Sequence, residues 1–100
     1  MAKSNPLDLL GLAQRAGRTI DGEERILKTF QTSQMKLVFL ANDAGQNITK
    51  KIKDKCQYYQ IPLIDTYSKS QLAQAISKAR TVVAITDEGF VNTILKALNQ

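Results

Sequence analysis

The segment Lys36-Leu37-Val38-Phe39-Leu40-Ala41 ends in five consecutive apolar residues, the longest such run in the chain. A strand with one face in water alternates apolar and polar side chains, whereas a continuous run of this length is typical of a strand that helices cover on both faces. The segment from Thr81 to Ile85 has the same character. We therefore predict two buried strands, at residues 36–41 and 81–85.

A helix is predicted to begin at Asn5-Pro6, well before the first of these strands. Proline suits the first helical position because it has no N–H to leave without a partner there. Gly17 supplies the end of this helix. The apolar residues between these signals follow at helical spacing, and they are Leu9, Leu12, Ala13 and Ala16.

A short extended piece around Thr19-Ile20 leads into a second predicted helix, which ends near Ser33. Asp21 and Glu24 stand in the relation of a capping box, in which the first side chain caps the helix and the second reaches back to it. The apolar side of this helix consists of Ile26, Leu27 and Phe30.

Helices and strands continue to alternate in the second half of the chain. Asn47 is a candidate cap for a third helix, residues 61–64 are a short strand entered through Pro62, and Ser68 with Gln71 can cap a fourth helix. Asp87 opens the last helix. The predicted inward residues of these three helices are Ile48, Ile52, Cys56 and Tyr59, then Leu72, Ala75 and Ile76, and finally Phe90, Val91, Ile94, Leu95 and Leu98.

The alternation of helices and strands predicts an α/β fold, a three-layer α/β/α sandwich around a short mixed sheet of about four strands. One hundred residues with 43% hydrophobic content are expected to form a single domain over residues 1–100.

Several classes of protein are disfavoured by what the chain lacks. It has no histidine and one cysteine, so neither a metal cluster nor a Cys-His pair is expected, and Cys56 is interpreted as a core thiol. Asp87-Glu88 is interpreted as a helix-dipole partner. No phosphate-binding glycine loop is present. We expect no catalysis, no cofactor and no metal, and, with no signal-peptide pattern from Met1 to Pro6 and no membrane-length apolar run, a soluble cytoplasmic protein.

The charge of the chain suits a polyanionic partner, because Lys and Arg number 14 against 9 acidic residues, a formal charge of +5. The lysines at 50, 51, 53 and 55 would spread around the polar side of one helix, and we interpret them as a solvated face. Other cations fall beside predicted helix ends and turns, where phosphates are often bound. They are Arg15, Arg18, Arg25, Lys28, Lys36, Lys78 and Arg80.

A family resemblance rests on several stretches that occur in order along nearly the whole chain. They are Gln14-Arg15-Ala16-Gly17-Arg18, Gly22-Glu23-Glu24-Arg25-Ile26-Leu27-Lys28, Lys36 through Ala44, Ile61-Pro62-Leu63, Ser68 through Ile76, and Arg80 through Ile85. In this respect the chain resembles the kink-turn-binding ribosomal proteins. The resemblance implies the same α/β/α sandwich and an RNA-binding function, with structured RNA, ribosomal or regulatory, as the partner, possible association with ribosomal subunits, and no membrane.

The resemblance also implies a site made of two elements. In the family, the start of the second helix reads G-x-N-E-x-x-K and touches the sheared G·A pairs and phosphates of a sharply bent RNA helix. The loop before the last strand caps flipped-out bases with small or apolar side chains. The corresponding residues here are Gly22, Glu23, Glu24, Arg25 and Lys28, with Ser77, Lys78, Ala79, Arg80 and Thr81; Arg18 and Lys36 are added as candidate phosphate contacts.

This chain departs from the family motif where Glu24 and Arg25 replace asparagine and glutamate. An ionised carboxylate only accepts hydrogen bonds and repels phosphate, whereas asparagine both donates and accepts. Glu24 either meets RNA or only caps its own helix, and Arg25 offers a phosphate or guanine contact in compensation. An alternative hypothesis is a protein–protein adaptor that has lost the RNA site. A third is an enzyme, or a substrate-recognition domain separated from one, since similar domains are found attached to RNA methyltransferases.

Overall fold

The computed structural model describes residues 5–98, so the segment 1–4, part of the signal-peptide argument, lies outside the description. Its elements are α1 (Pro6–Arg15), β1 (Thr19–Asp21), α2 (Glu23–Thr29), the 3-10 helix η1 (Phe30–Thr32), β2 (Leu37–Leu40), α3 (Gln46–Tyr59), β3 (Leu63–Ile64), α4 (Lys69–Ile76), β4 (Val82–Ile85) and α5 (Glu88–Leu98). The predicted order of helices and strands is confirmed, although β3 is shorter than the predicted strand at residues 61–64.

The four strands form one mixed sheet in the order β1-β4-β2-β3. β4 lies at the centre and pairs antiparallel with both β1 and β2, while β2 pairs parallel with β3. All four residues of β2 and all four residues of β4 are buried. The two apolar runs of the sequence are therefore buried strands, as predicted, and they are the two inner strands of the sheet.

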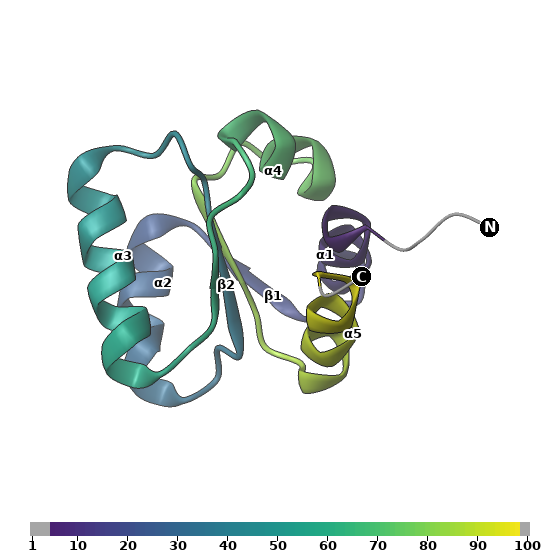
Figure 1. The fold of residues 1–100 in the computed structure, drawn as a ribbon, viewed down its shortest axis with the longest axis horizontal. Helices are drawn as coiled ribbons and strands as arrows, with labels where there is room; N and C mark the ends of the chain where they lie inside the picture. Colours follow the sequence, from purple (N-terminus) through teal and green to yellow (C-terminus); the bar gives the residue numbers. More distant parts are fainter. Residues whose placement is uncertain (1–4, 99–100) are drawn as a thin grey trace.

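Successive side chains of β2 point to opposite faces of the sheet, and each face has its own core. Leu37 and Phe39 belong to one cluster, and Val38 and Leu40 belong to the other. Figure 1 shows that α1, α4 and α5 cover the first face and that α2 and α3 cover the second. This arrangement is the predicted three-layer α/β/α sandwich.

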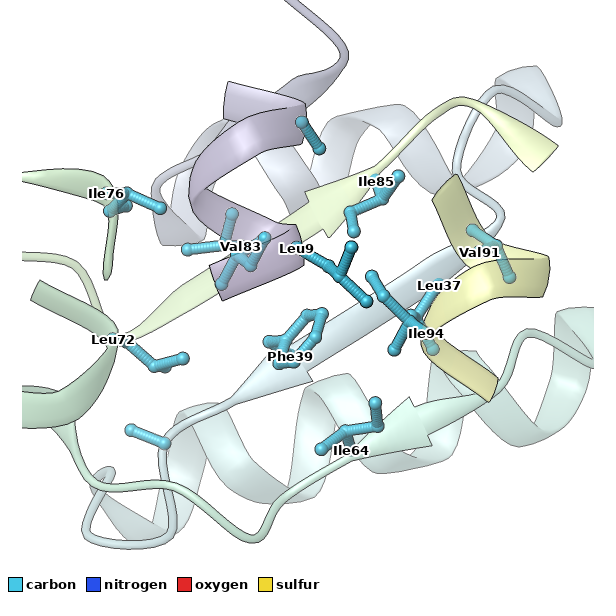
Figure 2. Packing of buried hydrophobic residues seen from close by; sticks show 13 residues of the cluster. Leu9, Leu37, Phe39, Ile64, Leu72, Ile76, Val83, Ile85, Val91 and Ile94 are labelled. Carbon is cyan, nitrogen blue, oxygen red and sulfur yellow. The ribbon is translucent and has the colours of Figure 1, made fainter. Parts of the chain in front are cut away.

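The first cluster is drawn in Figure 2, where Phe39 lies among side chains of α1, α4, α5 and the sheet. The second cluster contains Ile26 and Phe30 from α2 and η1, and Ile52 and Cys56 from α3. Cys56 is buried in this cluster, which confirms its interpretation as a core thiol, and burial raises its pKa to about 11.

Three predicted helix starts are confirmed and two predicted caps are wrong. Asp87 opens α5, since its carboxylate accepts a hydrogen bond from the Phe90 N–H at 3.0 Å. The Asn5 side chain accepts a hydrogen bond from the Leu7 N–H, and Ser68 forms the predicted reciprocal capping box with Gln71. The predicted capping box of Asp21 and Glu24 does not exist, because Gly22 is the N-cap of α2 and Asp21 still belongs to β1. Asn47 likewise lies inside α3, whose N-cap is Gly45.

The inward assignment of Leu98 is wrong, because Leu98 is exposed, and two of the apolar residues at helical spacing in α1, Leu12 and Ala16, are exposed as well. In α1 the buried set is Leu9, Leu10, Gly11 and Ala13. The helix packs against both α4 and α5, so its neighbours bury a wider arc of residues than the single apolar stripe that helical spacing predicts. Gly11 marks the close approach to α4, since a Cβ there would lie 2.8 Å from the Ala75 carbonyl oxygen. Leu98 is in the final turn described, beyond the last buried residue of α5, Ile94.

Candidate functional site

The start of α2 and the loop before β4 lie side by side at one end of the strands, where β1 finishes and β4 begins. The Gly22 N–H donates a hydrogen bond to the Val82 carbonyl at 3.2 Å, and Asp21 is in register with Val83. The two segments that the sequence singled out, residues 22–28 and 77–81, therefore meet in space. We call these two segments together the Gly22 edge.

Asp21 fastens the loop to this edge. Its carboxylate accepts a hydrogen bond from Arg80 Nε at 2.7 Å and lies 3.4 Å from Lys78 Nζ, and its side chain is only 13% exposed. Sequence reasoning missed this role, because 57 and 59 residues separate Asp21 from its partners and no local pattern links them. One carboxylate against two cations leaves the loop with a net positive charge, held at a fixed position.

The pKa of Asp21 reflects the same contacts. Burial alone raises it, but the hydrogen bonds and positive charges of Arg80 and Lys78 outweigh burial, and the pKa lies below the ordinary aspartate value. A carboxyl whose pKa is lowered by folding stabilises the protein above its unfolded pKa, and this stabilisation is lost as the pH falls through the folded pKa. The stabilisation is therefore fully present at neutral pH.

We predict that Asp21→Asn lowers the free energy of unfolding by about 1–2 kcal/mol at neutral pH, a value reduced for the exposure of the two cations. Urea unfolding of both proteins should be followed from neutral pH to about pH 3. The wild type should lose its advantage at the acid end of this range, below the ordinary pKa of aspartate. Parallel curves for the two proteins would show that Asp21 does not hold the loop electrostatically.

Gly22 has a backbone conformation that side chains rarely adopt, with φ +96° and ψ 138°. A Cβ at this position would meet no atom within 4 Å, so the glycine is required by the backbone and not by crowding from within the protein. The space beside Gly22 is open to a ligand. A large molecule can therefore approach the main chain closely at the start of α2.

The first turn and a half of α2 forms a shallow hollow lined by Gly22, Glu23, Glu24, Arg25 and Lys28. Lys28 Nζ lies 3.2 Å from Glu24 Oε1, and both side chains are more than three-quarters exposed. An ion pair this exposed contributes little to stability, so Lys28 can exchange its partner for another anion at small cost.

A second hollow lies on the other side of the loop, where Ala79, Arg80 and Thr81 face the start of α4. Its remaining lining residues are Lys69, Ser70 and Ala73. The loop begins at Ser77, which ends α4 in the left-handed conformation with φ +59°. All four loop residues from Ser77 to Arg80 are exposed. Sequence reasoning did not identify the α4 residues, because capping and helical signals accounted for them completely.

Arg18 and Lys36 do not join the Gly22 edge. The Arg18 carbonyl accepts from the Thr86 N–H, and the Lys36 N–H donates to the Ile85 carbonyl, so both residues lie at the opposite end of β4 from the loop. Lys36 lines a third hollow together with Arg25, Gln34 and residues of β1. Arg25 thus lines both this hollow and the one at the start of α2. The predicted cations therefore do not form one surface, since Arg18 and Lys36 lie at the far end of β4 and Arg15 lies on α1, which covers the other face of the sheet.

In the range 5–98, no group of three or more His, Cys, Asp or Glu side chains is placed to hold a metal ion. Within the same range, every buried side-chain nitrogen or oxygen has a hydrogen-bond partner. No helix among the described residues has the length and apolar character needed to cross a membrane. What the Gly22 edge offers is a set of cations, an open main-chain position and a loop with a small hollow beside it.

Comparison with known proteins agrees with this architecture. Residues 5–95 match the model of the ribosomal protein L7Ae/L30e/S12e/Gadd45 family, and the chain belongs to this family. It is 44% identical over 92 residues to the RNA-binding protein YlxQ of Bacillus subtilis (strain 168), covering 91% of this chain and 92% of that protein. It is 42% identical over 88 residues to the RNA-binding protein YlxQ of Enterococcus faecium, covering 88% and 85%.

Solved structures show the same fold. A protein of unknown function from Bacillus halodurans superposes with a TM-score of 0.88 at 40% identity, covering 95% of this chain and 97% of that one. The 15.5kD RNA binding protein of Giardia lamblia superposes with a TM-score of 0.80 at 21% identity, covering 93% and 81%, and this likeness concerns the fold. Both YlxQ relatives carry the names of RNA-binding proteins and not of enzymes, in agreement with the non-enzymatic prediction.

Proposed function

We propose that this chain is a non-catalytic RNA-binding protein that recognises kink-turn-type stems of ribosomal or regulatory RNA in the cytoplasm. The observation that carries the proposal is the Gly22 edge, where residues 22–28 and the loop 77–81 are joined by the Gly22–Val82 hydrogen bond and the Asp21 ion pairs. Family membership and the names of the two YlxQ relatives support RNA as the partner.

The geometry suits a bent RNA helix better than a regular duplex. Proteins read RNA through its shape, its backbone and its unstacked bases, because side chains do not reach into the deep groove of a regular RNA helix. The open space beside Gly22 admits an RNA backbone close to the main chain. Arg25 and Lys28 then stand on the exposed side of α2, where each can donate to a phosphate.

In this chain Glu24 and Arg25 stand where the family has asparagine and glutamate. Lys28 and the guanidinium of Arg25 itself compensate for the added negative charge and the lost amide. Glu24 is paired with Lys28, so its negative charge is partly neutralised before RNA arrives. Arg25 has five donors in a fixed fork, which can bind a phosphate or the acceptor edge of a guanine. The pair would shift the site from base-edge contacts towards phosphate contacts, and the RNA subtype would shift with it.

The loop supplies the place for flipped-out bases. Ala79 and Thr81 line the hollow beside α4, and Lys69 and Arg80 border it. A small apolar surface flanked by cations fits an unstacked base with its attached phosphate. Because Asp21 already fixes Lys78 and Arg80, this surface is ordered before binding and less entropy is lost when RNA binds.

The proposal predicts discrimination between two RNA stems in a calorimetric titration. One stem contains a standard kink-turn, and the other is the same stem with its tandem G·A pairs replaced by Watson–Crick pairs. We expect tight binding to the first and a large loss of affinity on the second. With about four or five neutralised phosphates, log K should fall with log salt at a slope of about −3 to −4. Equal binding to both stems would indicate only a basic surface and would favour a protein partner instead.

A further inference from the structure

The four lysines of α3 are not equivalent, although their sequence pattern predicted a uniform solvated face. Lys50 and Lys53 each have an aspartate partner, at 3.3 and 3.5 Å. Among residues 5–98, no carboxylate lies within 4.0 Å of Lys51 or Lys55. The helix therefore carries two neutralised lysines and two lysines whose charge is uncompensated.

The two uncompensated lysines share one face of α3 with an exposed aromatic ring. Lys51, Lys55 and Tyr58 are separated by four and three residues, which places them in line along the helix. Tyr58 is 79% exposed, more than any other large apolar side chain in the described part of the chain. We call these three residues the α3 stripe. Along the helix axis, its two cations are about 6 Å apart.

The α3 stripe lies on the flank of α3 that faces α2. Lys53 lies on the other flank of α3, the one that faces the edge strand β3, because it pairs with Asp65, which directly follows β3. Figure 1 shows α2 and α3 on the same face of the sheet. The helix begins near the Gly22 edge, since the Ala41 N–H at the end of β2 donates to the Thr81 carbonyl and α3 starts five residues later. The α3 stripe therefore leads away from that edge.

The ring of Tyr58 is held in place although it is exposed. It meets Tyr59 edge-on, with ring centroids 4.9 Å apart, and Tyr59 in turn stacks on the buried Phe30 at 5.8 Å. A supported and accessible ring of this kind is a platform on which an unpaired base can stack, and such stacking tolerates any base. Lysines beside such a ring bind the phosphates of the same strand.

We propose that the α3 stripe binds a single-stranded RNA segment that leaves the structured stem at the Gly22 edge. Lys51 and Lys55 bind successive phosphates, and a base stacks on Tyr58. This inference rests on the proposed function, because the stem must first be placed at the Gly22 edge. An acidic protein surface could pair with the two lysines, but such pairing does not involve the exposed ring of Tyr58. A single RNA strand uses both, because its phosphates bind the lysines and its bases stack on the ring.

The test compares a kink-turn stem with the same stem carrying a short adenosine tail at either open end, by fluorescence anisotropy. We expect the tail to strengthen binding by the wild-type chain about tenfold. Lys51→Ala with Lys55→Ala should abolish this gain and make the salt slope shallower by about 1.4, since single strands contribute about 0.7 for each phosphate. Lys50→Ala with Lys53→Ala removes the same charge from the same helix and should keep the gain.

Tyr58 is tested with a tail that lacks its bases. Tyr58→Ala should weaken binding of the adenosine tail and leave binding of the abasic tail unchanged, and Tyr58→Phe should retain the wild-type affinity. The inference is overturned if the tail adds no affinity, if the two lysine pairs behave alike, or if an acidic protein and not RNA responds to the α3 stripe. Failure of the proposed function has a different readout, equal affinity of the tailless kink-turn and Watson–Crick stems.

Discussion

Replacing both Arg25 and Lys28 by glutamate should weaken binding to a kink-turn stem about a hundredfold, with the fold retained. Each cation would lose a charge-assisted hydrogen bond, and such bonds contribute about 1.5–3 kcal/mol apiece. Because both side chains are exposed, the lower end of that range applies, and about 3 kcal/mol for the pair corresponds to about two orders of magnitude in affinity. The introduced carboxylates would also repel phosphate.

The fold should tolerate this change, because the residues do not contribute to either core. The exposed pair of Lys28 with Glu24 is worth little, and a glutamate at position 28 would add a weak like-charge repulsion one turn away. Circular dichroism and thermal unfolding should therefore remain close to those of the wild type. A large drop in unfolding temperature would mean that lost binding has a structural origin.

The matched control carries the same charge change on the opposite layer of the sandwich. Arg15→Glu with Lys96→Glu alters exposed residues of α1 and α5, and like the test pair it lowers the formal charge from +5 to +1, because 5 − 4 = 1. We expect this control to weaken binding only a few-fold, through long-range electrostatics. If both pairs weaken binding equally, affinity depends on total charge and the Gly22 edge has no special role.

The layers of this fold follow from short patterns because strand burial and helix spacing are local properties of the sequence. The run from Leu37 to Ala41 predicted a strand covered on both faces, and Leu37 and Val38 indeed reach different cores. The capping box of Ser68 and Gln71 is equally local and is present. Such signals need no knowledge of distant residues.

The capping role of Asp21 was predicted wrongly because residues far away in the sequence determine where its side chain binds. Its spacing to Glu24 fits a capping box, but its carboxylate is occupied by Lys78 and Arg80, and β1 extends through Asp21 because that residue is in register with Val83. A long-range ion pair overrides the local signal. The separation of Arg18 and Lys36 from the loop cations has the same origin, since it follows from the pairing of β4.

A large loss of stability is also expected from truncating a buried leucine of α1. Comparing Leu10 with Leu12 tests whether helical spacing or the packing of neighbouring helices decides which residues of α1 are buried. Leu10→Ala should lower the free energy of unfolding by about 2–5 kcal/mol, because Leu10 is fully buried in the first core and its removal leaves a cavity. Leu12→Ala is the matched control in the same helix. Leu12 is 46% exposed, so its truncation should cost less than about 1 kcal/mol.

The two substitutions share the same helix propensity, so the difference between them in urea unfolding measures burial alone. Helical spacing placed Leu12 with Leu9 on the apolar stripe, and equal losses for the two variants would support that placement. The observed packing predicts the opposite, because Leu10 is buried in the first core and Leu12 is exposed, while α4 lies against the neighbouring Gly11. The close approach at Gly11 allows that contact. The buried arc of α1 is therefore set by its neighbours, which helical spacing alone does not reveal.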